Sequence, residues 1–103
     1  MKNLNQEQFY AMKNTEGLKV VDFYAEWCGP CKMLGPVLEE LNAEMNDSVE
    51  FVKINIDENM ELAMEYSVTT VPTLVFMKDG QELSRKVGFV PKNSLQDEIE
   101  KIK

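Results

Sequence analysis

Segments typical of buried strands alternate along this chain with segments typical of amphipathic helices, and this alternation restricts the fold most strongly. Residues 18–24, LKVVDFY, form an apolar, β-branched and aromatic run, which is the composition of a strand covered on both faces. Residues 49–56, VEFVKINI, predict a second strand. Between them, from Pro30 onward, apolar residues recur with helical spacing. They are Leu34, Val37, Leu38, Leu41 and Met45.

The other segments extend the same pattern. Residues 2–4 can form a short strand. Residues 5–14, NQEQFYAMKN, predict a helix with Asn5 as N-cap, Gln8 completing a variant of the capping box and Gly17 as the stop signal. A short helix is predicted after Asn59. Strands are predicted at 73–77 and 81–88, joined by a hairpin turn at Asp79-Gly80. Leu95, Ile99 and Ile102 line one face of a last helix.

The predicted order is therefore β-α-β-α-β-α-β-β-α. Strand-helix-strand units favour parallel pairing through right-handed crossovers, and the late hairpin adds antiparallel strands. An α/β fold follows, with a mixed sheet covered by helices on both faces, in one domain spanning residues 1–103. Pro36 lies inside the second helix and should kink it, because proline removes one backbone hydrogen bond. The strand order stays undetermined.

Composition excludes several classes of function. The net charge of −7 leaves no basic patch for a nucleic acid. The chain has no histidine, so that Ser-His-Asp triads, Cys-His pairs and imidazole metal ligands are all excluded. No segment looks like a secretory leader or approaches the length of a membrane span. We expect a cytoplasmic protein without a membrane or nucleic-acid partner.

The only two cysteines lie in Trp27-Cys28-Gly29-Pro30-Cys31, and three interpretations compete. As a structural disulfide they would close a very short loop, which gains little stability. As metal ligands they would fill half of a tetrahedral shell, which no other cysteine or histidine completes. As an exchange pair, Cys28 would lie at a helix N-terminus, where the helix dipole stabilises a thiolate, with Cys31 one turn further on. This spacing would expose one sulfur and shield the other.

Residues outside the pair could support exchange chemistry. Asp22 is a carboxylate inside an otherwise apolar strand, which is costly unless it is paired or functional. It could exchange a proton with Cys31, and Lys53 in the next strand could be its charge partner, although a lysine can also reach solvent. Pro72 precedes a buried strand and marks a turn. About one X-Pro bond in twenty is cis, so residues alone favour trans.

Several motifs in register identify the chain as a member of the thioredoxin family. Residues 20–32, VVDFYAEWCGPCK, closely resemble the family's active-site segment. The segments VKINIDEN (52–59), VPTLVFMKDG (71–80) and KVGF (86–89) follow in the family's order and spacing. The resemblance implies the thioredoxin fold, a central five-stranded mixed sheet flanked by four helices in three α/β/α layers.

The resemblance also implies a role for each site residue. Cys28 would be the nucleophile and Cys31 the resolving thiol, while Asp22 would be the acid–base group with Lys53 near it. The Val71-Pro72 bond would be cis and face the disulfide, with the Val71 backbone binding an extended target chain. A flat apolar contact surface would comprise Trp27, Gly29, Pro30, Val71, Pro72, Gly88 and Phe89.

The implied activity is reduction of protein disulfides by a monomeric protein without a bound cofactor. A reversible Cys28–Cys31 disulfide would carry the electrons, which NADPH would supply through a flavoprotein thioredoxin reductase. Gly-Pro between the cysteines fits a reductant, because oxidising relatives often carry histidine there. Phe89 is bulkier than the usual residue after this glycine. Two alternatives stay open: a glutaredoxin-like protein fed by glutathione, and a binding module whose dithiol is incidental.

Overall fold

A five-stranded mixed sheet forms the centre of the computed structural model, which describes residues 1–103. The strand order is β1-β3-β2-β4-β5. Strands β1, β3 and β2 are parallel, whereas β4 runs antiparallel to both β2 and β5. The strands are β1 (Lys2–Asn3), β2 (Leu18–Tyr24), β3 (Val49–Asn55), β4 (Thr73–Lys78) and β5 (Gln81–Val87).

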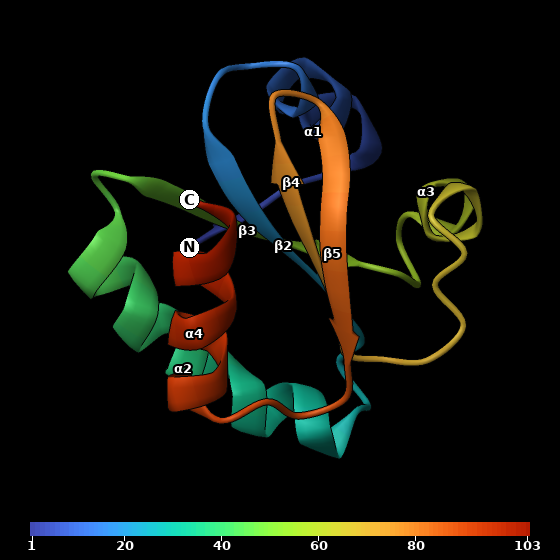
Figure 1. Cartoon of the computed structure of the whole chain (residues 1–103). Helices are drawn as coiled ribbons and strands as arrows, with labels where there is room; N and C mark the ends of the chain where they lie inside the picture. Colours follow the sequence, from blue (N-terminus) through green and yellow to red (C-terminus); the bar gives the residue numbers. More distant parts are fainter.

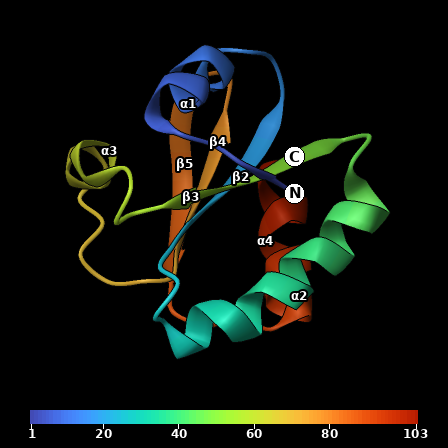
Figure 2. The same cartoon turned by 180° about the vertical axis from the view of Figure 1, so that it is seen from behind.

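Four helices cover the two faces of this sheet, as Figures 1 and 2 show from opposite sides. Helices α2 and α4 bury Leu34, Leu38 and Leu95 in one core cluster, and α1 and α3 bury Phe9 and Leu62 in another. The predicted three-layer α/β/α architecture is therefore confirmed. The helices are α1 (Gln6–Lys13), α2 (Gly29–Met45), α3 (Met60–Glu65) and α4 (Lys92–Ile102).

Local interactions set several of the element ends. Asn5 and Gln8 form the capping box at the start of α1, each side chain accepting a backbone N–H of the other. Asp79 and Gly80 both have positive φ, which is the hairpin turn expected between β4 and β5. The helix predicted at residues 5–14 is confirmed, with Asn5 and Asn14 as its caps, but Gly17 lies beyond its end and does not terminate it. The helix ends at Lys13, because the N–H and hydroxyl of Thr15 both donate to the carbonyl of Met12.

Strand β2 occupies the middle of the sheet and is buried at all seven positions. This confirms a strand covered on both faces. Its one buried lysine, Lys19, donates to the carbonyl oxygens of Thr15, Glu16 and Gly17 at 2.7, 3.1 and 3.3 Å. These bonds replace the hydration that a buried ammonium loses.

Helix α2 continues through Pro36 and changes direction along its length, which is visible in Figure 2. Only residues 25–28 separate the end of β2 from the start of α2, so the sheet fixes where the helix begins. None of the helices is long and apolar enough to span a bilayer.

Candidate active site

The two cysteines lie at the N-terminus of α2 and form a disulfide with a Cα–Cα distance of 5.2 Å. Cys28 is the N-cap, and the N–H of Cys31 donates to the Cys28 sulfur at 3.2 Å. Pro30 lies in the first turn, where a backbone N–H would have no helical partner. The Cys28 sulfur therefore occupies the positive end of the helix dipole, which stabilises a thiolate once the disulfide is reduced.

Neither sulfur is freely exposed in this disulfide form. Cys28 is 4% exposed and Cys31 6%, so the expected contrast between an exposed and a shielded cysteine is absent. Tyr24 and Ala25 form a buried cluster with the two cysteines, and Val71 packs against it. The residues around the pair, rather than helical spacing alone, determine its exposure.

The loop before β4 faces the disulfide, as the resemblance implied. The Val71-Pro72 bond is cis, and the Val71 carbonyl oxygen lies 3.6 Å from the Cys28 sulfur. This is a van der Waals contact, because the oxidised sulfur has no proton to donate. Gly88 adopts φ +90° after β5 and donates its N–H to the Pro72 carbonyl at 2.8 Å. The two loops thus hold one another beside the cysteines.

Asp22 lies below the disulfide, 3% exposed, and its Oδ1 atom has no hydrogen-bond partner. Burial raises the pKa of Asp22 to about 7, while the positive charge of Lys53 acts in the opposite direction. Lys53 is the direct neighbour of Asp22 across the β2–β3 pairing. The ammonium, however, lies over the ring of Tyr24, 5.1 Å from its centroid.

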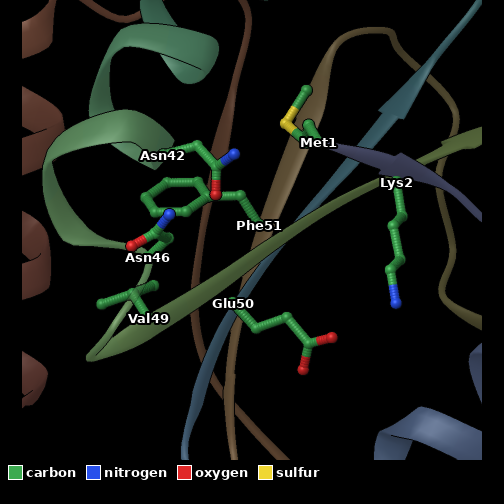
Figure 3. A pocket seen from close by; sticks show the side chains of 7 residues that line it. All are labelled: Met1, Lys2, Asn42, Asn46, Val49, Glu50 and Phe51. Carbon is green, nitrogen blue, oxygen red and sulfur yellow. The ribbon is translucent and has the colours of Figure 1, made fainter.

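A cavity of about 300 Å³ extends from the Asp22 carboxyl group to Cys31. Asp22, Cys31 and Lys53 all line it, so the carboxyl group and the second cysteine face the same cavity. A second hollow, of about 390 Å³, lies beside the β1–β3 edge, where the amides of Asn42 and Asn46 lie beside the Phe51 ring (Figure 3). It contains neither cysteine. The cavity of about 300 Å³ is the one that Asp22 and Cys31 share, and an adjoining hollow of about 170 Å³ is lined by Cys31 but not by Asp22.

The residues of the predicted contact surface are exposed or partly exposed, with one exception. Trp27 is 69% exposed and Phe89 42%, whereas Pro72 is buried. Gly29 and Pro30 are exposed, and Val71 and Gly88 are partly exposed. These placements agree with a docking surface, but their roles stay predictions.

Asp57 and Asn3 were missed by the sequence analysis, and they hold two aromatic side chains of the site by hydrogen bonds. Asp57 accepts a hydrogen bond from the Trp27 indole N–H at 2.8 Å and thereby fixes the exposed ring. The amide of Asn3 donates to the Tyr24 hydroxyl at 2.8 Å. No sequence signal indicates Asp57. The position of Tyr24, by contrast, could be inferred from the sequence. It lies two residues after Asp22, and residues two apart in a strand share one face.

Comparisons with known proteins agree with this geometry. The thioredoxin family model matches residues 1–101. The thioredoxin of Bacillus subtilis is 48% identical over 95 residues, covering 92% of this chain and 91% of that protein. The Staphylococcus aureus thioredoxin is 46% identical over 89 residues, covering 86% of each chain.

Solved structures give the same result. Fasciola hepatica thioredoxin superimposes with a TM-score of 0.91 at 40% identity, covering 100% of both chains. Plasmodium falciparum thioredoxin also gives a TM-score of 0.91, at 32% identity and full coverage of both chains. The architecture is thus the thioredoxin fold. By sequence, fold and the cysteine pair at the start of α2, this chain belongs to the thioredoxin family.

Proposed function

We propose that this protein, a protein disulfide oxidoreductase, works as a reductant of protein disulfides through Cys28 and Cys31. One observation carries the proposal. The disulfide lies at the N-terminus of α2, and Asp22 shares a cavity with Cys31 directly beneath it. A structural cross-link would need neither the helix N-terminus nor the buried carboxyl.

Cys28 performs the first step. In the reduced protein its thiolate is stabilised by the N–H of Cys31, 3.2 Å away in the disulfide form, and by the helix dipole. The thiolate attacks one sulfur of a target disulfide, whose S–S bond breaks. The second target sulfur leaves as a thiolate and takes up a proton, so that a mixed disulfide joins Cys28 to the target.

Cys31 and Asp22 perform the second step. The Asp22 carboxylate accepts the proton of the Cys31 thiol, and the resulting thiolate attacks the Cys28 sulfur. The mixed disulfide breaks, the target sulfur leaves and is protonated, and Cys28–Cys31 closes. The target gains two electrons and two protons. A pKa of about 7 suits Asp22 to this task, because both protonation states are populated near neutral pH.

The target docks beside the disulfide. An extended target segment adds to the Val71 backbone as a short strand, with its side chains on the exposed Trp27 and Phe89. Gly29, Pro30 and Gly88 leave room for the target backbone, and Phe89 restricts which targets fit.

Electrons come from NADPH through a flavoprotein thioredoxin reductase, and the protein works as a monomer in the cytoplasm. No bound cofactor takes part, because the two sulfurs carry both electrons. The net charge of −7 argues against nucleic acid as a partner.

The test is NADPH consumption in the presence of a thioredoxin reductase and a protein disulfide. Wild type should turn over, and Cys28→Ser should be inactive. Cys31→Ser is the matched variant: it should release one target sulfur and then accumulate a covalent mixed disulfide through Cys28. The two roles are reversed if only Cys28→Ser traps the target. The proposal fails if Cys28→Ser equals wild type, or if glutathione alone supports full turnover.

A further inference from the structure

Three neighbouring strands bring a group of polar side chains to one face of the sheet. Asn3 on β1 pairs with Lys53 on β3, which in turn pairs with Asp22 on β2. Tyr24 follows Asp22 by two residues and therefore shares its face. This is the face covered by α2, because Val20 and Phe51, of the same parity, belong to the α2 core cluster.

Tyr24 is the fixed member of this group. It is 8% exposed, and the Asn3 amide holds its hydroxyl at 2.8 Å. Lys53 is only partly buried and has a long flexible side chain, so its ammonium could extend into solvent. It lies over the Tyr24 ring instead, 5.1 Å from the centroid, within range of a cation–π interaction.

We propose that Tyr24 is a positioning residue, whose ring holds the Lys53 ammonium at the wall of the cavity that Asp22 and Cys31 line. The inference rests on the proposed acid–base role of Asp22. Without the ring, the ammonium leaves for solvent and the cavity loses the positive charge that favours ionisation of the carboxyl. Tyr24 therefore acts on proton transfer only through Lys53.

Other charged groups near the cavity do not replace this interaction. From α2, Glu39 lines the cavity, and it binds the amino group of Met1 at 3.0 Å. Cys31 lines it from the same helix. Glu26 and Lys32 border only the adjoining hollow. On the β4 side, the neighbour of Asp22 is the uncharged Leu74. Lys53 is thus the cation whose position matters most to Asp22.

The decisive experiment changes the charge distribution on the face of the ring at position 24 and keeps a flat six-membered ring there. Phenylalanine and pentafluorophenylalanine are placed at position 24, and the Asp22 carboxyl carbon is titrated by NMR in the oxidised protein. Tyr24→Phe keeps the ring face and should titrate like wild type. Pentafluorophenylalanine reverses the charge of the ring face, so it should raise the Asp22 pKa by roughly half a pH unit. An unchanged or lowered pKa would overturn the inference.

A double-mutant cycle tests whether the effect passes through Lys53. Lys53→Met should raise the Asp22 pKa at least as far as the fluorinated ring does. Combining the two changes should then produce no further rise, and an additive rise would overturn the proposal. Tyr66 provides the matched control, because Lys13 lies over its ring at 5.9 Å on the opposite face of the sheet. Pentafluorophenylalanine at position 66 should leave the Asp22 titration unchanged.

The same variants separate this inference from the proposed function. In single-turnover assays, the pH midpoint of mixed-disulfide release should move with the Asp22 pKa. If Asp22→Asn leaves that pH profile unchanged, the acid–base role of Asp22 is wrong, whatever Tyr24 does. If Asp22→Asn abolishes the profile but fluorination at position 24 does not move the Asp22 titration, only the role of Tyr24 is wrong.

Discussion

Replacing Asp22 by asparagine should stabilise the protein strongly above neutral pH and hardly at all in acid. The pKa of Asp22 is raised from 3.8 to about 7 by burial. The folded state therefore binds this proton more tightly than the unfolded state, and wild-type stability falls as pH rises from about 4 to about 7. The side-chain amide of the Asp22→Asn variant cannot ionise, so the variant escapes this loss.

The size of the effect follows from the pKa difference between the two states. One pKa unit corresponds to about 1.4 kcal/mol, so the ionised Asp22 carboxylate costs the folded protein about 4 kcal/mol. Chemical unfolding of the two oxidised proteins should be compared at pH 4 and pH 8. At pH 8 the urea midpoint of Asp22→Asn should exceed that of wild type by more than about 1 M. At pH 4 the two midpoints should nearly coincide.

Asp47→Asn provides the control, because it removes one negative charge from an exposed position. It should shift the midpoint little at either pH. The reasoning is refuted if Asp22→Asn and wild type differ by the same amount at pH 4 and pH 8. It is also refuted if the variant is the less stable protein at pH 8.

Three further variants test individual contacts, two at the end of the sheet far from the cysteines and one beside the site. Lys19→Met leaves three carbonyl groups without their donor and should lower the free energy of unfolding by about 2 kcal/mol, measured by urea unfolding, with reductase-coupled turnover unchanged. Gly80→Ala puts a Cβ at φ +88°, 2.6 Å from the Asn14 side-chain oxygen, and should cost about 1–2 kcal/mol. Adding Asn14→Ala should recover only the steric part, and full recovery would show that φ is not limiting. Asp57→Ala frees the Trp27 indole, so time-resolved fluorescence anisotropy should show faster local motion of that ring.

The order of helices and strands could be predicted because each element carries a local signal. The apolar run of β2, the helical spacing after Pro30 and the Asp79-Gly80 turn depend on nearby residues alone. Strand order depends on which edges meet after collapse, so no segment encodes it. The interaction that ends α1 escaped prediction, because the Thr15 hydroxyl binds the Met12 carbonyl and Gly17 is not needed.

The residues of the site also divide into those that a local sequence signal indicates and those that it does not. Cys28, Cys31 and Asp22 stood out because their residue types are unusual for their positions. The cis bond before Pro72 followed only from the resemblance, since a residue-by-residue estimate favours trans. The exposure of the sulfurs and the place of the Lys53 ammonium depend on side chains from several elements, which no single stretch of sequence specifies.

The central place of β2 has a consequence for how the molecule opens. Backbone amides in β2 are bonded on both sides, by β3 and β4, whereas β1 and β5 lie at the edges. Edge strands fray at low free-energy cost, and central strands exchange their amide hydrogens only in near-global opening. Asp22 belongs to that central strand, which ends at Tyr24, shortly before Cys28. Asp22 and its strand therefore stay in register while the periphery fluctuates, and hydrogen-exchange protection should be highest in β2, the strand that precedes the cysteine pair.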